Sequence, residues 1–439
     1  MKKTLLLMVL LLGIKSNKSL ATIFEISPTD NIITATNALQ PGDILELTTG
    51  LYSVTLRFGV TLNCTAALPC IIRAKAGHTP HVNRPNANQN IVDIENSTYV
   101  TFKGIEFSGG SRGLRVNNSS FISLIDNHIH DTGDAAITAN DNNKLYQGLN
   151  FTHNHIHHTN GTGEGMYLGC NNNGCQVFDS VFANNYIHHT NGSSVSQGDG
   201  IELKEGSYNN VIRDNVIHDT GYPCLITYST VGNGAANILE GNVMWGCGDH
   251  AIQSAADTII RNNIILGAAF DGIHCQAHQN GVPSNLEITH NTALNTNGSV
   301  IRISSISGPI TIANNALYSQ SGVAIRASGT LSDLTVSNNI GQGSLIGVSS
   351  GFDNMGSLSS DFSNASFSGV LPQDVFPKAG SALINTADAQ YNAAIDFNLS
   401  SRVGSLDVGA YRYDTAGNSG WTIAQEFKPA DIIFENGFE

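Results

Sequence analysis

The sequence predicts an all-β protein, a right-handed parallel β-helix built as a solenoid of three-strand coils. One observation is a recurring segment, "NHIHDTG" from Asn127, "NHIHHTNG" from Asn154, "NYIHHTNG" from Asn185 and "NVIHDTG" from Asn215. A second is that the apolar runs beside these copies, such as "GIELK" and "NVIRD", are short and alternate with polar residues, which is the period of a β-strand. A third is the lack of any amphipathic helix of ordinary length between them. Short strands that recur without helices indicate the stacked units of a solenoid.

The repeat is marked by one asparagine after each short apolar run, at steps of 21 to 31 residues. The series is Asn127, Asn154, Asn185, Asn215, Asn242, Asn263, Asn291, Asn315 and Asn339. A side-chain amide can bond both to the backbone and to the next amide, so we expect these asparagines to stack inside a bend. Successive coils would then lie about 4.8 Å apart, the spacing of hydrogen-bonded strands.

The recurring histidines lie on the outside of the expected coils, because the isoleucine beside each of them points inward. The outward column is His130, His157, His188 and His218, and the same position continues as Trp245 and Leu266. One interpretation is a stacked surface column that needs no ligand. The other is a histidine-rich metal strip without a fixed carboxylate or cysteine partner, formed by His153, His155, His157, His158, His188 and His189.

The chain divides into four parts. Residues 1–21 have the basic start, short apolar run and small-residue ending of a secretory signal peptide. Residues 22–345 are expected to form the β-helix, with residues 27–40 as an N-terminal helical cap. Residues 346–413 are expected to form a C-terminal cap, and residues 414–439 a linker and tail. Caps are needed because an open solenoid end exposes core and unpaired backbone.

Charge and export narrow the range of partners. The formal charge is -14, and removal of the four signal lysines lowers it to -18. A chain this acidic lacks the clustered Lys and Arg that neutralise phosphates, which argues against a nucleic-acid partner. No segment after the signal is apolar for long enough to cross a bilayer. We therefore expect a secreted monomer without a transmembrane segment, located outside the cell, in the periplasm or at the cell surface.

The seven cysteines fit disulfides of an exported protein. The expected pairs are Cys64 with Cys70, Cys170 with Cys175, and Cys224 with Cys247, and Cys275 is left over. No CxxC pair occurs, which disfavours metal binding by thiolates.

Four segments carry a family resemblance: "QPGDILELTTGLYS", "PCIIRAKAG", the "NxIHDTG" repeats and "RVGSLDVGAYRY". On these segments the chain to about residue 413 resembles secreted bacterial right-handed parallel β-helix proteins of the pectate-lyase-like superfamily. It is most similar to polysaccharide lyase family six, the alginate and chondroitin lyase group. The resemblance implies two calcium-binding carboxylates on one rung, a lysine base shortly after them and an arginine on the next rung. Here "GDGIELKEGSYNN" offers Asp199, Glu202 and Lys204 at a different spacing, and Tyr228 stands where the arginine is expected.

Aligning the first strand of successive coils predicts one outward row of side chains. The row is Thr138, Tyr167, Glu202, Ile226, Gln253, His274, Arg302 and Arg326, and the strand entrances add Glu164, Asp199, His250 and Asp271. The inward partners are all Ile, Leu or Met, as a core requires. We therefore expect a groove in which a sugar chain meets about one residue per coil.

The residue types in this row suit β-elimination from a uronic acid. Calcium held by Asp199 and Glu202 would neutralise the uronate carboxylate and so acidify the C5 proton. Lys204 would take that proton, and Tyr228 or His274 would protonate the departing oxygen. The residues expected to bind substrate are Glu164, Tyr167, His250, Asp271, Arg302 and Arg326.

Three functions remain open at this point. The first is a polysaccharide lyase acting on an acidic, uronate-containing polysaccharide. The second is a non-catalytic glycan-binding or adhesin-like β-helix protein, in which Glu202 and Lys204 are an ordinary surface ion pair. The third is a glycoside hydrolase acting through two carboxylates such as Asp199 and Asp271.

Overall fold

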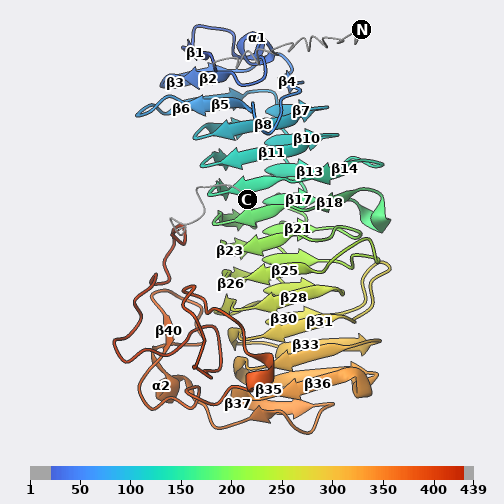
Figure 1. Ribbon diagram of the computed structural model, residues 1–439, viewed down its shortest axis with the longest axis vertical. Helices are drawn as coiled ribbons and strands as arrows, with labels where there is room; N and C mark the ends of the chain where they lie inside the picture. Colours follow the sequence, from blue (N-terminus) through green and yellow to red (C-terminus); the bar gives the residue numbers. More distant parts are fainter. Residues whose placement is uncertain (1–20, 430–439) are drawn as a thin grey trace, which may run out of the picture.

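The computed structural model describes residues 21–429, which form an elongated parallel β-solenoid with a C-terminal segment folded along one flank (Figure 1). Residues 1–20, which hold most of the expected secretory signal, and residues 430–439 lie outside the described part. Between residues 21 and 429, no helix combines the length and the apolarity needed to cross a bilayer.

One face of the solenoid is a 13-stranded parallel sheet within the described residues. Its strands, in order, are β1 (Ile23–Ile26), β2 (Ile44–Leu47), β5 (Cys70–Ala74), β8 (Thr98–Lys103), β11 (Ser120–Ile125), β15 (Asn150–Thr152), β19 (Val181–Ala183), β22 (Val211–Arg213), β25 (Asn237–Glu240), β28 (Thr258–Arg261), β31 (Leu286–Thr289), β34 (Ile310–Ala313) and β36 (Leu334–Ser337). Each strand comes from the next turn of the chain, so residues 21 to 31 positions apart become neighbours.

The other strands of the solenoid form one 23-stranded sheet within the described residues, whose pairing follows two ladders that join at the long strands near its end. The first ladder holds β3 (Gly50–Ser53), β6 (Pro80–Arg84), β9 (Glu106–Gly109), β12 (His128–His130), β16 (His155–His157), β20 (Tyr186–Thr190), β23 (Val216–Thr220), β26 (Val243–Cys247), β29 (Ile264–Ile265) and β32 (Thr292–Asn295). The second holds β4 (Gly59–Val60), β7 (Val92–Glu95), β10 (Leu114–Asn117), β13 (Ile137–Ala139), β17 (Met166–Leu168), β21 (Ile201–Leu203), β24 (Leu225–Thr227), β27 (Ile252–Ser254), β30 (Ile273–Cys275) and β33 (Ser299–Ile306). Strands β35 (Ala316–Gly329) and β37 (Asn339–Ile346) continue both ladders, and β38 (Phe352–Asp353) follows them.

Helices are few and short. Helix α1 (Ile32–Asn37) lies at the first turns, where Ile32 is buried. The side-chain amide of Asn37 donates a hydrogen bond of 2.8 Å to the carbonyl of Gly59 in β4. Helix α1 is shorter than the helix predicted over residues 27–40, because Ser27 to Asp30 forms a turn closed by a 2.8 Å bond from the Ser27 amide to the Asp30 carboxylate. The remaining elements are α2 (Leu358–Asp361), 3-10 turns at Asn171–Asn173, Leu331–Asp333 and Ala389–Tyr391, and two small sheets, β14 (Leu145–Gln147) with β18 (Gln176–Phe178) and β39 (Phe362–Asn364) with β40 (Asp374–Pro377).

The asparagine series forms the predicted ladder inside a bend. The Asn215 amide nitrogen donates to the Phe182 carbonyl and to Asn242 Oδ1, both at 2.9 Å. Its own Oδ1 accepts from the backbone and the side chain of Asn185, also at 2.9 Å. The same pattern repeats from Asn127 to Asn339. The ladder satisfies backbone groups that the bend would otherwise bury without partners, which explains why each turn from Asn127 to Asn339 carries one asparagine.

The core is a continuous apolar column inside the solenoid. In the ladder that carries the predicted row, the inward residues are Ile137, Met166, Ile201, Leu225, Ile252, Ile273, Ile301 and Ile325, all fully buried. The predicted inward and outward alternation is therefore confirmed.

The C-terminal segment runs back along the flank of the solenoid, whereas residues 346–413 were expected to cap its end (Figure 1). Three apolar residues, namely Trp245 of β26, Leu266 directly after β29 and Leu294 of β32, form a second hydrophobic cluster with it. At these positions the outward column changes from histidines to apolar side chains. Another segment has to pack on these apolar side chains to bury them. The expected linker and tail also pack there as far as they are described, since Ile423 and Lys428 are buried.

The three predicted disulfides are confirmed. Cys64 bonds to Cys70, Cys170 to Cys175, and Cys224 to Cys247, whereas Cys275 is a free, buried thiol.

Candidate functional site

The outward row predicted from the sequence is confirmed by the strand register. It runs through Thr138, Tyr167, Glu202, Ile226, Gln253, His274, Arg302 and Arg326, on β13, β17, β21, β24, β27, β30, β33 and β35. The ionisable side chains of this row and of the strand entrances gather in two separate clusters.

The first cluster contains Glu164, Asp199, Glu202, Lys204 and Tyr228, and we call it the carboxylate–lysine cluster. Lys204 Nζ lies 2.5 Å from Glu202 Oε1 and donates to the Tyr228 hydroxyl at 3.2 Å. The Tyr228 hydroxyl donates to the same Glu202 oxygen at 2.9 Å. The ammonium also lies 4.8 Å from the ring centre of Tyr167 and 4.9 Å from that of Tyr228, a cation–π arrangement.

Local backbone geometry explains the "GDG" that introduces this cluster. A Cβ at Gly200 would lie 2.4 Å from the Cys224 carbonyl oxygen, so only glycine fits where β21 meets the next turn. Asp199 is held just before that point. The alternation along β21 then places Glu202 and, two residues later, Lys204 on one side of the sheet.

Burial controls the charges of the cluster. It raises the pKa of Asp199 well above its usual value, and the neighbouring Glu202 and Glu164 carboxylates raise it further. Burial also raises the pKa of Glu164. For Lys204, burial lowers the pKa, but the charges and hydrogen bonds of Glu202 and Tyr167 outweigh it, so the pKa rises overall. Asp199 therefore favours its neutral form, and Lys204 is protonated as long as Glu202 faces it.

The carboxylates of this cluster fit a calcium ion. One oxygen each of Glu164, Asp199 and Glu202 lies within 4.8 Å of the others, and all three side chains are buried. Glu164 Oε1 and Glu202 Oε2 receive no hydrogen bond from any described residue, although both atoms are buried. Carboxylate oxygens are the ligands that Ca²⁺ prefers, and a cation would offset the mutual repulsion of the three carboxylates. Glu164, predicted to bind substrate, thus lies with the two predicted metal ligands.

The second cluster contains His250, Asp271, His274 and Arg302. The Asp271 amide donates to His250 Nδ1 at 3.1 Å, so Nε2 of that ring carries the proton and donates to His274 Nδ1 at 2.9 Å. Arg302 Nη1 lies 3.8 Å from Asp271 Oδ2. Burial lowers the pKa of His250, and burial together with His250 lowers that of His274 to about 4. Both imidazoles are therefore neutral at pH 7.

Lys204 and His274 are too far apart to act on one bond. Ile226 and Gln253 stand between Glu202 and His274 in the register, which makes the separation three strand spacings, roughly 14 Å. Lys204 and Tyr228 are brought together as predicted, but His274 is not with them. The strand entrances of Asp199 and Asp271 are equally separated, beyond the roughly 5–9.5 Å that a pair of glycosidase carboxylates requires.

A loop over residues 276–284 covers the carboxylate–lysine cluster, which differs from the open groove expected from the sequence. Gln279 bonds to the backbone amide of Asn172 at 2.8 Å and to the side chain of Asn171 at 2.9 Å. The ring of His278 lies 4.7 Å from that of Tyr228. As a result Lys204 is only 6% exposed.

These loop residues were not predicted, because the loop belongs to a turn three strands further along and has no counterpart in the repeat. On the open part of the row, Tyr167 and Arg326 are half-buried and the Arg302 side chain is 44% exposed. Those three side chains remain available to a ligand on the surface.

The comparisons with known proteins agree with the fold. The family model of the right-handed β-helix region matches residues 187–341, and no curated protein sequence is significantly similar to the chain. Pectate lyase Pel9A superposes with a TM-score of 0.54 at 15% identity, covering 90% of this chain and 98% of that one. The PL6 family alginate lyase AlyGC gives 0.48 at 14% identity, covering 84% of this chain and 58% of that one. The catalytic domain of a GH87 α-1,3-glucanase, in complex with nigerose, gives 0.43 at 13%, covering 77% and 70%.

At these identities the likeness concerns the fold alone. The chain forms a right-handed parallel β-helix, which is the fold that the sequence predicted.

Proposed function

We propose that this protein is a secreted polysaccharide lyase that cleaves an acidic, uronate-containing polysaccharide by β-elimination at the carboxylate–lysine cluster. The observation that carries the proposal is the mutual contact of Lys204, Tyr228 and Glu202 beside two further buried carboxylates. A candidate base, a candidate acid and a candidate cation site thereby lie within one patch of three successive strands. Perturbed ionisable groups of this kind gather at catalytic sites.

The proposed reaction removes the C5 proton of a uronate and breaks the C4–O bond, leaving a C4=C5 double bond. Lys204 takes the C5 proton once Glu202 no longer faces it, because burial alone favours the neutral amine. Burial and Glu202 raise the pKa of Tyr228, so its hydroxyl keeps a proton to give to the departing oxygen. The 3.2 Å contact between Lys204 and Tyr228 then lets the captured proton restore the hydroxyl.

Calcium held by Glu164, Asp199 and Glu202 would supply the positive charge that neutralises the substrate carboxylate. Such an ion would also draw Glu202 away from Lys204, which the base role requires. The rest of the row binds the polysaccharide, with Tyr167 on one side and Arg302 and Arg326 on the other. His250, Asp271 and His274 are assigned to sugar binding, since their cluster lies too far from Lys204 for catalysis. The loop over residues 276–284 has to move aside to admit substrate.

The proposal includes export and the finer organisation of the fold. Residues 1–21 act as a cleaved secretory signal, and the three disulfides suit an oxidising compartment. Each coil contributes three strands, α1 caps the first coil, and the segment after residue 345 caps the last one before it runs along the flank.

The test is the ultraviolet absorbance of unsaturated uronides after incubation of the mature chain with pectate, alginate and glycosaminoglycans, with calcium and with a chelator. We expect product with at least one polyuronate, and a loss of about 10²–10⁴-fold in rate for Lys204→Ala. The matched control is Lys103→Ala, an exposed lysine of β8 on another face. The proposal is refuted if no polyuronate yields unsaturated product, or if Lys204→Ala and Lys103→Ala retain equal activity.

A glycan-binding protein without activity is the second candidate, and the burial of Lys204 beneath the loop favours it. It predicts retention of a polyuronate on the surface without product, unchanged by Lys204→Ala but weakened by Arg302→Ala. A hydrolase is distinguished by saturated reducing ends, and it would use Asp199 with Glu202 in place of the distant Asp271.

A further inference from the structure

An array of imidazoles lies on the first ladder of the 23-stranded sheet, whereas the candidate site lies on the second ladder of the same turns. We call it the histidine array, and its members are His128, His130, His155, His157, His158, His188, His189 and His218. Strands β12, β16, β20 and β23 carry these residues in parallel register. The column predicted from the sequence, His130 to His218, is confirmed as one column of the array.

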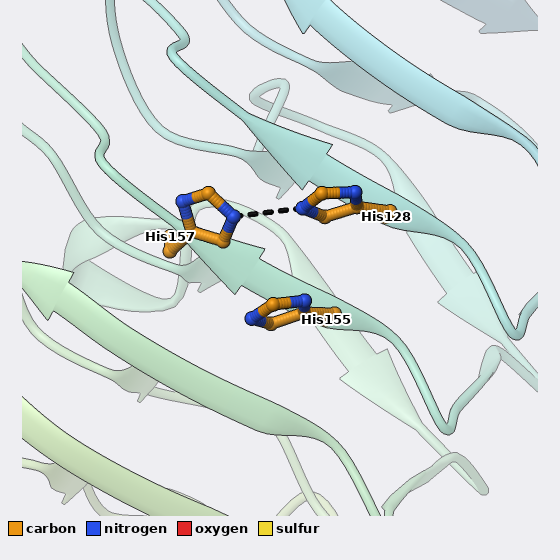
Figure 2. Close-up of side chains that lie close together, drawn as sticks. All are labelled: His128, His155 and His157. Carbon is orange, nitrogen blue, oxygen red and sulfur yellow. Dashed lines mark hydrogen bonds between the residues drawn. The ribbon is translucent and has the colours of Figure 1, made fainter. Parts of the chain in front are cut away.

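Three of these side chains converge on one point of the surface. His128 and His155 are register partners on β12 and β16, and their rings stack with centres 4.7 Å apart and planes 8° from parallel (Figure 2). His157, two residues along β16, turns its Nε2 toward His128 Nε2 at 2.7 Å (Figure 2). One ring nitrogen of each of the three lies within 4.8 Å of the others.

The three imidazoles are half-buried, which leaves them accessible to ions from solvent yet sheltered from full hydration. A neutral imidazole, which is the main form at neutral pH for a histidine with an ordinary pKa of about 6.5, offers the lone pair of one ring nitrogen to a metal. His158 Nδ1 lies 2.6 Å from His157 Nδ1 and fixes the orientation of that ring.

We propose that His128, His155 and His157 form a binding site for a divalent transition metal, with Zn²⁺ as the reference ion. Three imidazole nitrogens with no thiolate are a common ligand set for Zn²⁺, Ni²⁺ and Cu²⁺, whereas Ca²⁺ and Mg²⁺ prefer oxygen. The ligand chemistry and the ladder both differ from those of the carboxylate–lysine cluster. The proposal therefore does not depend on the proposed lyase activity.

Metal binding requires a small adjustment of the rings. Two nitrogens bound to a tetrahedral Zn²⁺ at about 2.0–2.1 Å are roughly 3.3 Å apart, so His128 and His157, now 2.7 Å apart, must part by about 0.6 Å. The three nitrogens lie within 4.8 Å of one another, so His155 must approach the other two by up to about 1.5 Å. Rotation of half-exposed side chains about their χ angles supplies this shift without movement of the strands. A fourth position toward solvent is left for water or for a fourth ligand.

A purely structural array makes a different prediction. The observed contacts can also be hydrogen bonds between neutral rings, with one N–H donor and one acceptor in each pair. Such an array has no preference for metals and loses nothing but surface packing when one ring is replaced. The two interpretations are separated by binding measurements.

The experiment is calorimetric titration of tag-free mature protein with Zn²⁺, alone and in calcium buffer, for the wild type, His128→Gln and His157→Gln. Glutamine retains a polar side chain at each position, and circular dichroism verifies the fold of each variant. The matched control is His78→Gln, a half-buried histidine outside the array. We expect one Zn²⁺ bound with micromolar or tighter affinity, unaffected by calcium, and at least tenfold weaker binding in both array variants but not in the control.

Replacement of Zn²⁺ by Co²⁺ provides a spectroscopic check, because nitrogen coordination gives visible absorption bands that should vanish in His157→Gln. The proposal is overturned if the wild type binds no Zn²⁺ in this range. It is also overturned if His128→Gln and His157→Gln bind Zn²⁺ as tightly as the wild type, because the ion would then be bound by other residues. His157→Gln should have the same activity on polyuronates as the wild type, because the array is not part of the proposed catalytic site. The zinc measurements can therefore be interpreted even if the lyase proposal fails.

Discussion

The asparagine ladder provides the sharpest test of the fold, through the substitution Asn215→Ala. Asn215 lies in the middle of the ladder, is fully buried, and contacts the asparagines of the turns before and after it. Alanine removes the whole amide and leaves the backbone conformation allowed. The variant therefore probes the side-chain bonds and not the bend itself.

The magnitude follows from four hydrogen bonds. The Asn215 side chain donates to the Phe182 carbonyl and to Asn242, and accepts from the amide and the side chain of Asn185. At a net contribution of about 1 kcal/mol each, their loss costs about 4 kcal/mol. The Asn185 amide and the Phe182 carbonyl are then buried without these partners, which adds about 1–2 kcal/mol. We expect the free energy of unfolding to fall by about 5–6 kcal/mol.

The measurement is urea unfolding followed by far-ultraviolet circular dichroism, with Asn88→Ala as the control. Asn88 is an exposed asparagine outside the ladder, so its replacement should change the free energy by less than about 0.5 kcal/mol. Asn215→Asp is nearly isosteric but turns a second acceptor toward Phe182 and Asn242, so it should be no better than alanine. A loss of less than 1 kcal/mol for Asn215→Ala would refute the role given to the ladder.

Three further outcomes are expected. Lys428→Met should destabilise the protein by about 3–5 kcal/mol, because it leaves the buried carboxylate of Asp214 without the ammonium 2.5 Å away. Thermal unfolding measures this loss, and an unchanged Tm would mean that Lys428 does not anchor the flank segment. Burial and the Arg402 charge lower the pKa of His290 to about 3. Below about pH 6.5 the unfolded chain binds a proton at this histidine and the folded chain does not, so the free energy of unfolding falls as the pH drops from 6.5 toward 3. His290→Asn, tolerated at a φ of 54°, should flatten this part of the Tm profile, and an identical slope would contradict the assignment. The buried Cys275 thiol, whose pKa burial raises, should react with a thiol reagent only after denaturation, and rapid labelling of the folded protein would show that it is accessible.

The confirmed predictions share one physical basis. In a solenoid each turn lies on the previous one, so the spacing of Asn127, Asn154 and the later asparagines fixes which residues become neighbours. The outward row, the inward core and the histidine column all follow from that register. The disulfides followed as well, because two of them close loops within a few residues and the third, Cys224 to Cys247, joins adjacent turns.

The candidate site was predicted only in part. The strand alternation correctly put Glu202 and Lys204 on one side, and the register brought Tyr228 to them. His274, named as an alternative acid to Tyr228, lies three strand spacings from Lys204 and does not join these residues.

The sequence by itself determined the solenoid, its register and the chemistry of each column, because the repeat is local and periodic. Only the tertiary structure decided what covers the surface. The bond from Gln279 to Asn172 joins residues 107 positions apart, and the bond from Lys428 to Asp214 joins residues 214 apart. Both arise from segments outside the repeat, whose positions depend on which exposed surfaces they can bury and which buried charges they can pair. No period in the sequence encodes those contacts, and the first of them holds the loop that covers Lys204.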